Sequence, residues 1–260
     1  MDVKFKLKNQ MRKQYVSLLA FLIATGAFYV SCDGRMSKPT GALEFDNITM
    51  DESVHLFGDT AKPGAKLIID FAYVDKSNDD SLMAFRNDQF IAICFDSKYM
   101  HTDVKTVVQN YAGDYTGEYR MDLEPMFLED QRANNREDQL TIASWYDYYQ
   151  NIKSEVQLYE KDILIYKVDF DEYTGGAHGM NRTNFLNIDL KNQHVLTLDD
   201  IFVDDYSDAL VQLLWEQLMI DNNVSSREEL EQLGLGLIGD VERVEKFFLD
   251  KKGITLFYNS

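Results

Sequence analysis

The chain is poor in proline and in basic residues. It has only three prolines in 260 residues, and its 26 lysines and arginines face 44 aspartates and glutamates, which gives a net charge of −18. The scarcity of proline and the lack of a low-complexity block argue against a long proline-rich linker. The acidic surplus argues against nucleic acid as a partner, because a field of that sign repels phosphate.

Cysteine and histidine are also scarce. The two cysteines are Cys32 and Cys94, and the second lies in the apolar stretch from Phe90 to Phe95, where it is expected to be a small buried residue rather than a nucleophile. The four histidines are scattered, at His55, His101, His178 and His194, and none forms an HxH or HExxH pattern. The paired aspartates at 199–200 and 204–205 lack the glycine-bearing loop of a calcium hand. We therefore predict no metal site and no cofactor.

Long hydrophobic runs are limited to one, near the start. Basic residues up to Lys13 precede a largely apolar run of 16 residues from Tyr15 to Val30, a length typical of a signal-peptide core and shorter than the roughly 20 residues of a spanning helix. The run ends at Ser31-Cys32, which resembles the cleavage box of bacterial lipoproteins, although Tyr29 stands where that box usually carries leucine. We predict export and lipidation of Cys32, with an uncleaved anchor or ordinary secretion as alternatives. Met11 is an alternative start, because Arg12 and Lys13 would still supply its charged end.

Removal of the predicted signal peptide, residues 1–31, makes the chain more acidic. That segment carries five basic residues and one acidic residue, so the net charge falls from −18 to −22. A tether over residues 32–41 would then join the lipid to the folded part. The expected location is the Gram-negative periplasm or outer membrane, with the lipid as the membrane anchor. Such a charge keeps a protein soluble and would also attract a cationic partner.

The first half of the folded part has a mixed pattern. Residues 53–57 and 66–74 alternate as strands, and the second is apolar on both faces, as expected of a central strand. Residues 81–97 fit helix and strand equally, whereas 102–111 have the apolar spacing of a helix. The polar stretch 134–138 is the best candidate for a subdomain boundary.

The second half has a clear β pattern followed by a helix. Residues 140–160, 163–170 and 185–190 are predicted strands, the last two forming a long hairpin around 171–184, and residues 195–202 are expected to continue the sheet. An amphipathic helix is predicted over 207–221, a short helix after the capping box Ser225-Ser-Arg-Glu228, and a final hairpin from Phe247 to Tyr258.

The most specific string is Tyr173-Thr-Gly-Gly-Ala-His-Gly179. Its glycines permit positive φ and expose backbone amides, and His178 can exchange protons near neutral pH. The string closely resembles the YxGGAHG signature of the extracytoplasmic domain pair named domains of unknown function 4163 and 3298. Further segments agree in the same order: Asn187–Leu190, Leu196–Phe202, the amphipathic helix, Phe247–Leu249 and Gly253–Asn259. The resemblance covers about residues 41–260 and is more convincing from residue 163 onward.

The resemblance implies a binding module of the cell envelope. Members of that family include the lysozyme-sensing ectodomain of RsiV-like anti-sigma factors and the non-catalytic N-terminal module of PdaC-like peptidoglycan deacetylases. The implied partners are thus a lysozyme-like cationic protein or peptidoglycan. At most 14 residues precede the apolar run, too few for a sigma-factor-binding regulator, and the chain has no room for a deacetylase domain. Family members usually continue past the last strand, so the resemblance also implies a chain truncated at its C-terminus.

His178 has two interpretations. Paired with Asp171 or Glu172, its imidazole could act as an acid–base group. We favour a structural role, in which the ring bonds to backbone and closes the glycine loop, because no nucleophile has a suitable spacing around it.

The aromatic cluster from Trp145 to Tyr149 could form a stacking platform for sugar rings. Strand alternation would put Trp145 and Tyr149 on one face, and Tyr146 and Tyr148 on the other. One of these pairs should then lie in the core, which leaves the other for contact with glycan.

Together these patterns predict an α+β lipoprotein of antiparallel sheets packed with helices. Its two subdomains are residues 42–137, which resemble domain 4163, and residues 138–260, which resemble domain 3298. The predicted function is non-enzymatic binding or sensing of lysozyme-like proteins or peptidoglycan, with no catalytic residue. The candidate binding loop comprises Tyr173, Gly175, Gly176, His178 and Gly179. The alternative function is a peptidoglycan hydrolase or deacetylase that uses His178.

Overall fold

The computed structural model describes residues 43–133, 144–235, 246–251 and 253–256, and it divides into two compact units. The N-terminal unit is Gly41–Val195 and the C-terminal unit begins at Leu196. The division therefore lies away from the expected boundary at residue 137, because strands on both sides of that position pair in one sheet. The predicted signal peptide, Cys32 and the tether lie outside the described residues, as does the end of the chain from residue 257. None of the helices in the described segments is long and apolar enough to cross a membrane.

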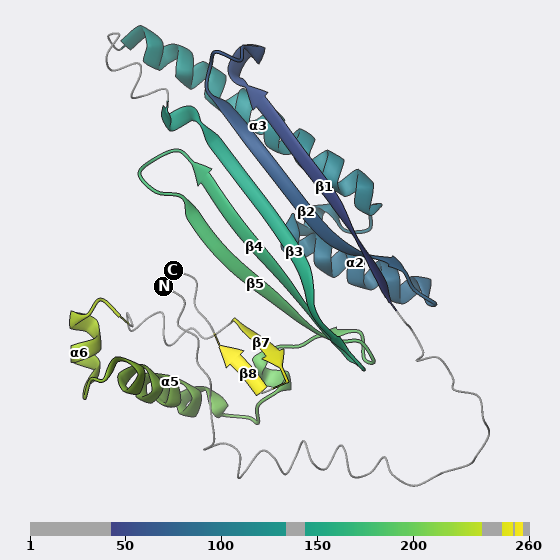
Figure 1. Ribbon diagram of the computed structural model, residues 1–260, viewed down its shortest axis with the longest axis vertical. Coiled ribbons are helices and arrows are strands. Elements are labelled where there is room, and N and C mark those ends of the chain that lie inside the picture. Colours follow the sequence, from purple (N-terminus) through teal and green to yellow (C-terminus); the bar gives the residue numbers. More distant parts are fainter. Residues whose placement is uncertain (1–42, 134–143, 236–245, 252, 257–260) are drawn as a thin grey trace. The chain divides into compact units, whose positions relative to one another are not determined.

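The N-terminal unit is built on a mixed six-stranded sheet with the order β1-β2-β3-β4-β5-β6 (Figure 1). The strands are β1 (Glu44–His55), β2 (Gly64–Lys76), β3 (Tyr148–Glu160), β4 (Ile163–Thr174), β5 (Met180–Asp189) and β6 (His194–Val195). All neighbours are antiparallel except β2 and β3, which run parallel. The α+β class is confirmed, but the sheet is not purely antiparallel, because two helices connect β2 to β3 as a crossover.

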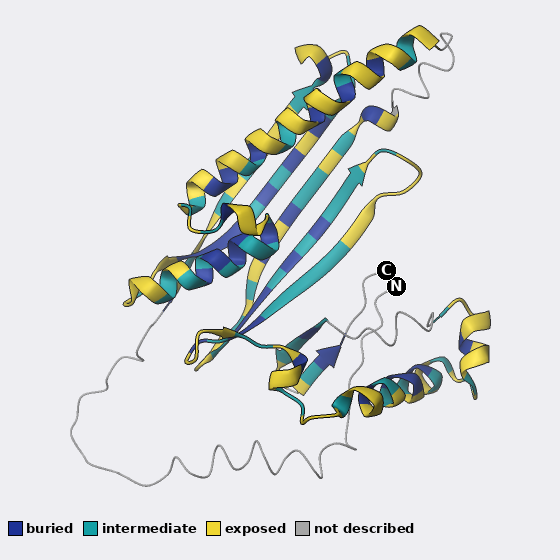
Figure 2. Ribbon diagram, turned by 180° about the vertical axis from the view of Figure 1, so that it is seen from behind, coloured by how far each residue is buried: buried dark blue, intermediate teal, exposed yellow. Residues whose placement is uncertain are grey.

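Two helices cover one face of this sheet. Helix α2 (Asp80–Cys94) packs on β2 and β4, and helix α3 (Val104–Ala133) packs on β1 and β2. Asp79 begins α2 by accepting bonds from the backbone N of Ser81 at 2.9 Å and of Leu82 at 3.2 Å. The predicted helix at 102–111 is only the first part of α3, which continues through Pro125. In Figure 2 these helices lie in front of β1 and β2 and leave parts of β3, β4 and β5 in view.

The core lies between the helices and the sheet. Strand β2 is central, as predicted, and Leu67, Ile69 and Phe71 on its helix-facing side are all at most 1% exposed. The alternation of buried and exposed residues along the strands is visible in Figure 2. Ser154 and Tyr166 make a buried polar link across this core, since the Tyr166 hydroxyl lies 2.7 Å from Ser154 Oγ and donates to the carbonyl of Ala72 at 2.6 Å.

The C-terminal unit has its own small core. It contains α5 (Tyr206–Asn222), α6 (Arg227–Gln232) and the hairpin of β7 (Phe247–Asp250) and β8 (Gly253–Leu256), as predicted in outline. Among its described residues the buried hydrophobic side chains are Leu198, Leu210, Leu214, Trp215, Leu218, Leu230, Phe247 and Leu256.

Two local predictions in this part of the chain are wrong in detail. The predicted strand 195–202 is mostly a turn, because Asp200 accepts a bond from the backbone N of Thr197 at 2.7 Å and stabilises the 3-10 helix η5 (Leu198–Asp200). The cap of α6 is one residue later than predicted. Ser226 accepts from the backbone N of Glu229, and the Glu229 carboxylate accepts from the backbone N of Ser225 at 2.7 Å.

Candidate functional site

The candidate loop connects β4 to β5 and contains residues 175–179. Gly175 and Gly176 have φ values of 83° and 97°, which side chains with a Cβ atom rarely adopt. The Tyr173 hydroxyl donates to the carbonyl of Gly176 at 2.7 Å and closes the turn. The two consecutive glycines are therefore required by the path of the backbone.

The loop also packs closely against the segment that leads into β3. A Cβ atom on Gly175 would lie 2.6 Å from the carbonyl oxygen of Trp145, which is closer than real contacts allow. At Gly179 a Cβ atom would lie 3.0 Å from the Glu172 carbonyl oxygen and 3.2 Å from the Tyr149 hydroxyl. Gly179 does not have positive φ, so a side chain there is opposed by space alone, and its neighbours would have to move by a few tenths of an ångström.

His178 is exposed, and its surroundings support neither acid–base catalysis nor closure of the loop by its ring. No hydrogen bond or ion pair of His178 occurs within the described residues, so its ring does not close the loop as we had expected. The two carboxylates that could pair with it have other partners. Asp171 Oδ1 accepts from the Tyr149 hydroxyl at 3.0 Å, and Glu172 Oε2 accepts from Gln150 Nε2 at 3.0 Å.

The aromatic residues at the start of β3 and just before it divide into the predicted exposed and buried pairs, although Trp145 and Tyr146 lie in the 3-10 helix η4 (Ser144–Tyr146) and not in the strand predicted over 140–160. Trp145 is 57% and Tyr149 39% exposed, whereas Tyr146 is 5% exposed and Tyr148 packs beside it in a small core cluster. The register pairs Tyr149 with Tyr173, and their rings stack with centroids 6.1 Å apart and an angle of 21°. Trp145, Tyr149 and Tyr173 thus lie next to the glycine turn. We call these three residues, together with residues 175–179, the loop surface.

The carboxylate of Asp171 lies beside the loop surface and affects the pKa of Tyr149. The hydrogen bond to Asp171 raises the pKa of Tyr149, because a neighbouring carboxylate disfavours the phenolate. On the opposite, helix-facing side of the sheet, the Tyr111 hydroxyl donates to Gln150 Oε1 at 2.6 Å, and burial raises the pKa of Tyr111 to about 12. These tyrosines act as neutral hydrogen-bonding groups at physiological pH.

Neither a cluster of metal ligands nor a reactive cysteine occurs in the described part of the chain. No group of three or more His, Cys, Asp or Glu side chains there could hold a metal ion. Cys94 is 1% exposed and burial raises its pKa to about 12, which confirms its interpretation as an inert core residue.

A comparison with solved structures identifies the relatives of this fold. The crystal structure of a member of the DUF3298 family from Bacteroides fragilis is 51% identical in sequence, with a TM-score of 0.79, and the match covers 85% of each chain. The chain belongs to the DUF3298 family. The predicted resemblance to domain 3298 is confirmed, while the resemblance to domain 4163 stays a prediction.

More distant comparisons add little. A DUF3298 family protein from Pseudomonas aeruginosa is 12% identical, with a TM-score of 0.47 over 74% of this chain and 73% of that one, too low to support an argument. No family model and no curated protein matches the sequence.

The residues of the loop surface could be named from the sequence of this DUF3298 protein, but their proximity in space could not be predicted. It placed Tyr173 with the glycines and Tyr149 with the aromatic cluster, as separate features. The missing step was the register between β3 and β4, which puts Tyr149 opposite Tyr173. A hairpin's register can be estimated from its turn, but β3 and β4 also contain a shift between Val156 and Leu158.

Proposed function

We propose that the chain is a non-catalytic binding module of the cell envelope, anchored by lipid on Cys32, and that its loop surface binds a lysozyme-like cationic protein. The observation that carries this proposal is the gathering of three partly or largely exposed aromatic residues beside a backbone turn that requires glycine. Tyrosine and tryptophan are the residues that most often dominate binding energy at protein interfaces. A rigid turn keeps them in place without a large entropy cost on binding.

The surroundings of His178 favour binding over catalysis. An acid–base histidine needs a group that orients its ring, and the nearest candidates in sequence, Asp171 and Glu172, bond to Tyr149 and Gln150 instead. The alternative of a peptidoglycan hydrolase or deacetylase therefore has less support. We assign His178 to the rim of the binding surface.

The charge of the chain supports a cationic partner. Residues 32–260 carry a net charge of −22, because the −18 of the whole chain includes a leader with five basic residues and one acidic residue. Opposite net charges raise the rate of encounter, whereas contacts of aromatic side chains supply the specificity. The resemblance to lysozyme-sensing ectodomains supplies the class of partner.

Peptidoglycan is a second candidate ligand, favoured by the Trp145 ring. This ring is 57% exposed, and sugar rings stack well on aromatic planes. A glycan would bind with little dependence on salt, whereas a cationic protein would bind with a strong dependence.

Isothermal calorimetry tests these assignments with a chain of residues 33–260, which lacks the leader and Cys32. We expect lysozyme to bind, more weakly at 0.5 M salt than at low salt but still measurably, and Trp145→Ala to weaken binding by about tenfold or more. Ile220→Ala is the matched control, because Ile220 is 70% exposed in the other unit.

Three results would contradict parts of the proposal. Binding that disappears at 0.5 M salt, or that an unrelated acidic protein reproduces, would indicate nonspecific attraction. Binding of peptidoglycan fragments but not of lysozyme would favour the second candidate. Turnover of peptidoglycan that His178→Ala abolishes would favour the enzyme.

A further inference from the structure

Strand β1 forms one edge of the sheet, and its hydrogen-bonding pattern shows which groups face outward. The backbone N of Leu56 donates to the carbonyl of Pro63 at 3.0 Å, next to the pair of His55 with Gly64. Bonded and non-bonded pairs alternate in an antiparallel ladder, so the backbone groups of Asn47, Thr49, Asp51 and Ser53 point away from β2. The N–H of Asn47 agrees with this, because it donates to the side chain of Asp46 at 2.8 Å instead of to β2.

This edge lacks three of the features that often protect a sheet edge, namely a proline, a lysine of its own and a bulge within the strand. Among the described residues only β2 pairs with β1. The strand contains no proline, lysine or arginine, and its one register shift lies at its beginning, between Glu44 and Phe45. Long regular edges are templates for another strand, and proteins commonly block them with lysine, proline or a bulge.

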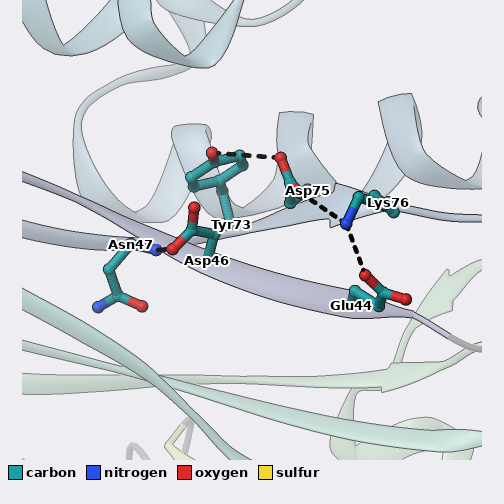
Figure 3. Close-up of polar contacts among 6 residues, drawn as sticks. All are labelled: Glu44, Asp46, Asn47, Tyr73, Asp75 and Lys76. Carbon is teal, nitrogen blue, oxygen red and sulfur yellow. Dashed lines mark hydrogen bonds and ion pairs between the residues drawn. The ribbon is translucent and has the colours of Figure 1, made fainter.

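The charges along the edge indicate what kind of strand it fits. Strand β1 carries Glu44, Asp46, Asp51 and Glu52 and no positively charged lysine or arginine. Two lysines of β2 reach it: Lys66 lies 3.3 Å from Asp51, and Lys76 lies 2.9 Å from Glu44 (Figure 3).

The other two carboxylates have no basic partner in the described segments. Figure 3 shows Asp46 bonded only to the neighbouring Asn47. Asp46 and Glu52 therefore remain available to side chains of an added strand.

We propose that the outer edge of β1 binds an extended segment of a partner protein, with lysine or arginine at alternate positions, as an additional strand. Backbone bonds to Thr49 and its outward-facing neighbours would provide affinity, and cross-strand pairs with the carboxylates would provide selectivity. This site does not depend on the loop surface, which is formed by β3, β4 and their connections. A second copy of the chain fits less well, because pairing of two β1 strands doubles the carboxylates at the joint.

The test uses synthetic peptides and fluorescence anisotropy with residues 33–260. The probe is an eight-residue peptide of alternating lysine and valine. Its matched control has the same sequence with N-methyl groups on the two central backbone amides. These two amides point to opposite sides of the extended peptide, so one of them faces β1 whichever side of the peptide binds. We expect the probe to bind and the control to bind about tenfold more weakly, because it keeps the charge but loses backbone bonds. A peptide of alternating glutamate and valine should not bind.

Two variants of one residue complete the test from the side of the protein. Thr49→Pro removes an outward N–H without removing a bond to β2, and Thr49→Val keeps that N–H. We expect Thr49→Pro to lower the affinity for the probe by about tenfold and Thr49→Val to leave it unchanged. Thermal denaturation checks that both variants are folded. Should Thr49→Pro fail to fold, the comparison of the two cationic peptides still decides.

Three outcomes would overturn the proposal. Equal affinity for the probe and its N-methylated control would mean that charge alone attracts the peptide. Equal binding by Thr49→Pro and Thr49→Val would place the peptide elsewhere. Sedimentation that shows a dimer abolished by Thr49→Pro would assign the edge to a second copy of this chain.

Discussion

Replacement of Gly175 by alanine should destabilise the protein more than the same replacement at Gly176. Both glycines have positive φ, which costs an alanine about 1–2 kcal/mol, partly offset by about 0.4–1 kcal/mol from the less flexible unfolded chain. At Gly176 no heavy atom lies within 4 Å of the added Cβ atom, so this is the whole effect. At Gly175 the Cβ atom would also meet the Trp145 carbonyl oxygen at 2.6 Å, and moving that backbone adds about 1–3 kcal/mol.

We therefore expect Gly175→Ala to lower the free energy of unfolding by about 2–4 kcal/mol and Gly176→Ala by about 1 kcal/mol. For a chain of this size each kcal/mol lowers Tm by about 2–4 °C, which calorimetry detects easily. His178→Ala is the control from the same loop, with an expected change within about 0.5 kcal/mol, because the ring is exposed. Equal Tm values for Gly175→Ala and Gly176→Ala would refute the close approach of the loop to Trp145.

Three further predictions concern other parts of the chain. Cys32→Ala should abolish metabolic labelling with a fatty-acid probe, and equal labelling of both proteins would disprove lipidation. Because burial raises the folded-state pKa of Tyr111 to about 12, its contribution to stability is present below about pH 10 and lost as the pH rises toward 12, so urea denaturation should show a smaller alkaline loss in Tyr111→Phe. Asp88→Ala should lower the free energy of unfolding by about 1–3 kcal/mol, because Asp88 is 9% exposed and its carboxylate accepts a bond from the backbone N of His101 at 2.6 Å. His101 has a φ of 62°, so the double change Asp88→Ala with His101→Gly should recover part of the lost Tm.

The elements with regular local patterns could be predicted from the sequence. Helix α5 has a strict period of 3.6, and its bounds differ from the prediction by one residue at each end. The β4–β5 hairpin was predicted in type and order, but its connection is 175–179 and not 171–184, because both strands continue through mostly polar residues that carry no apolar alternation. Helix α3 was underestimated because Gly113, Gly117 and Pro125 interrupt its pattern, although its buried face from Val107 to Phe127 is continuous in three dimensions. Packing against β1 and β2 stabilises the helix beyond what its local sequence indicates.

The candidate site could be predicted in its parts only. The predicted separation of the exposed Trp145 and Tyr149 from the buried Tyr146 is confirmed, although Trp145 and Tyr146 lie in a 3-10 helix where strand alternation does not apply. The part of Tyr173 in closing the turn could not be foreseen, because a tyrosine hydroxyl bonding three residues ahead has no sequence signature comparable to a glycine pair. The assignment of loop closure to His178 followed from the lack of a suitably spaced nucleophile, which argues against catalysis but does not show that the ring bonds to backbone.

The parallel pairing of β2 with β3 has a consequence for how the chain folds. Ala65 lies opposite Tyr148, and the bond from the backbone N of Ala72 to Ser154 Oγ spans 82 residues. By contrast, β1 with β2 and β3 with β4 and β5 are joined through short connections. Contacts between distant residues form slowly, because the loop must close before the contact is gained. We expect the two antiparallel halves of the sheet to form first and the pairing of β2 with β3 to limit the folding rate. Until that pairing forms, the unpaired edges of β2 and β3 are transiently open to aggregation.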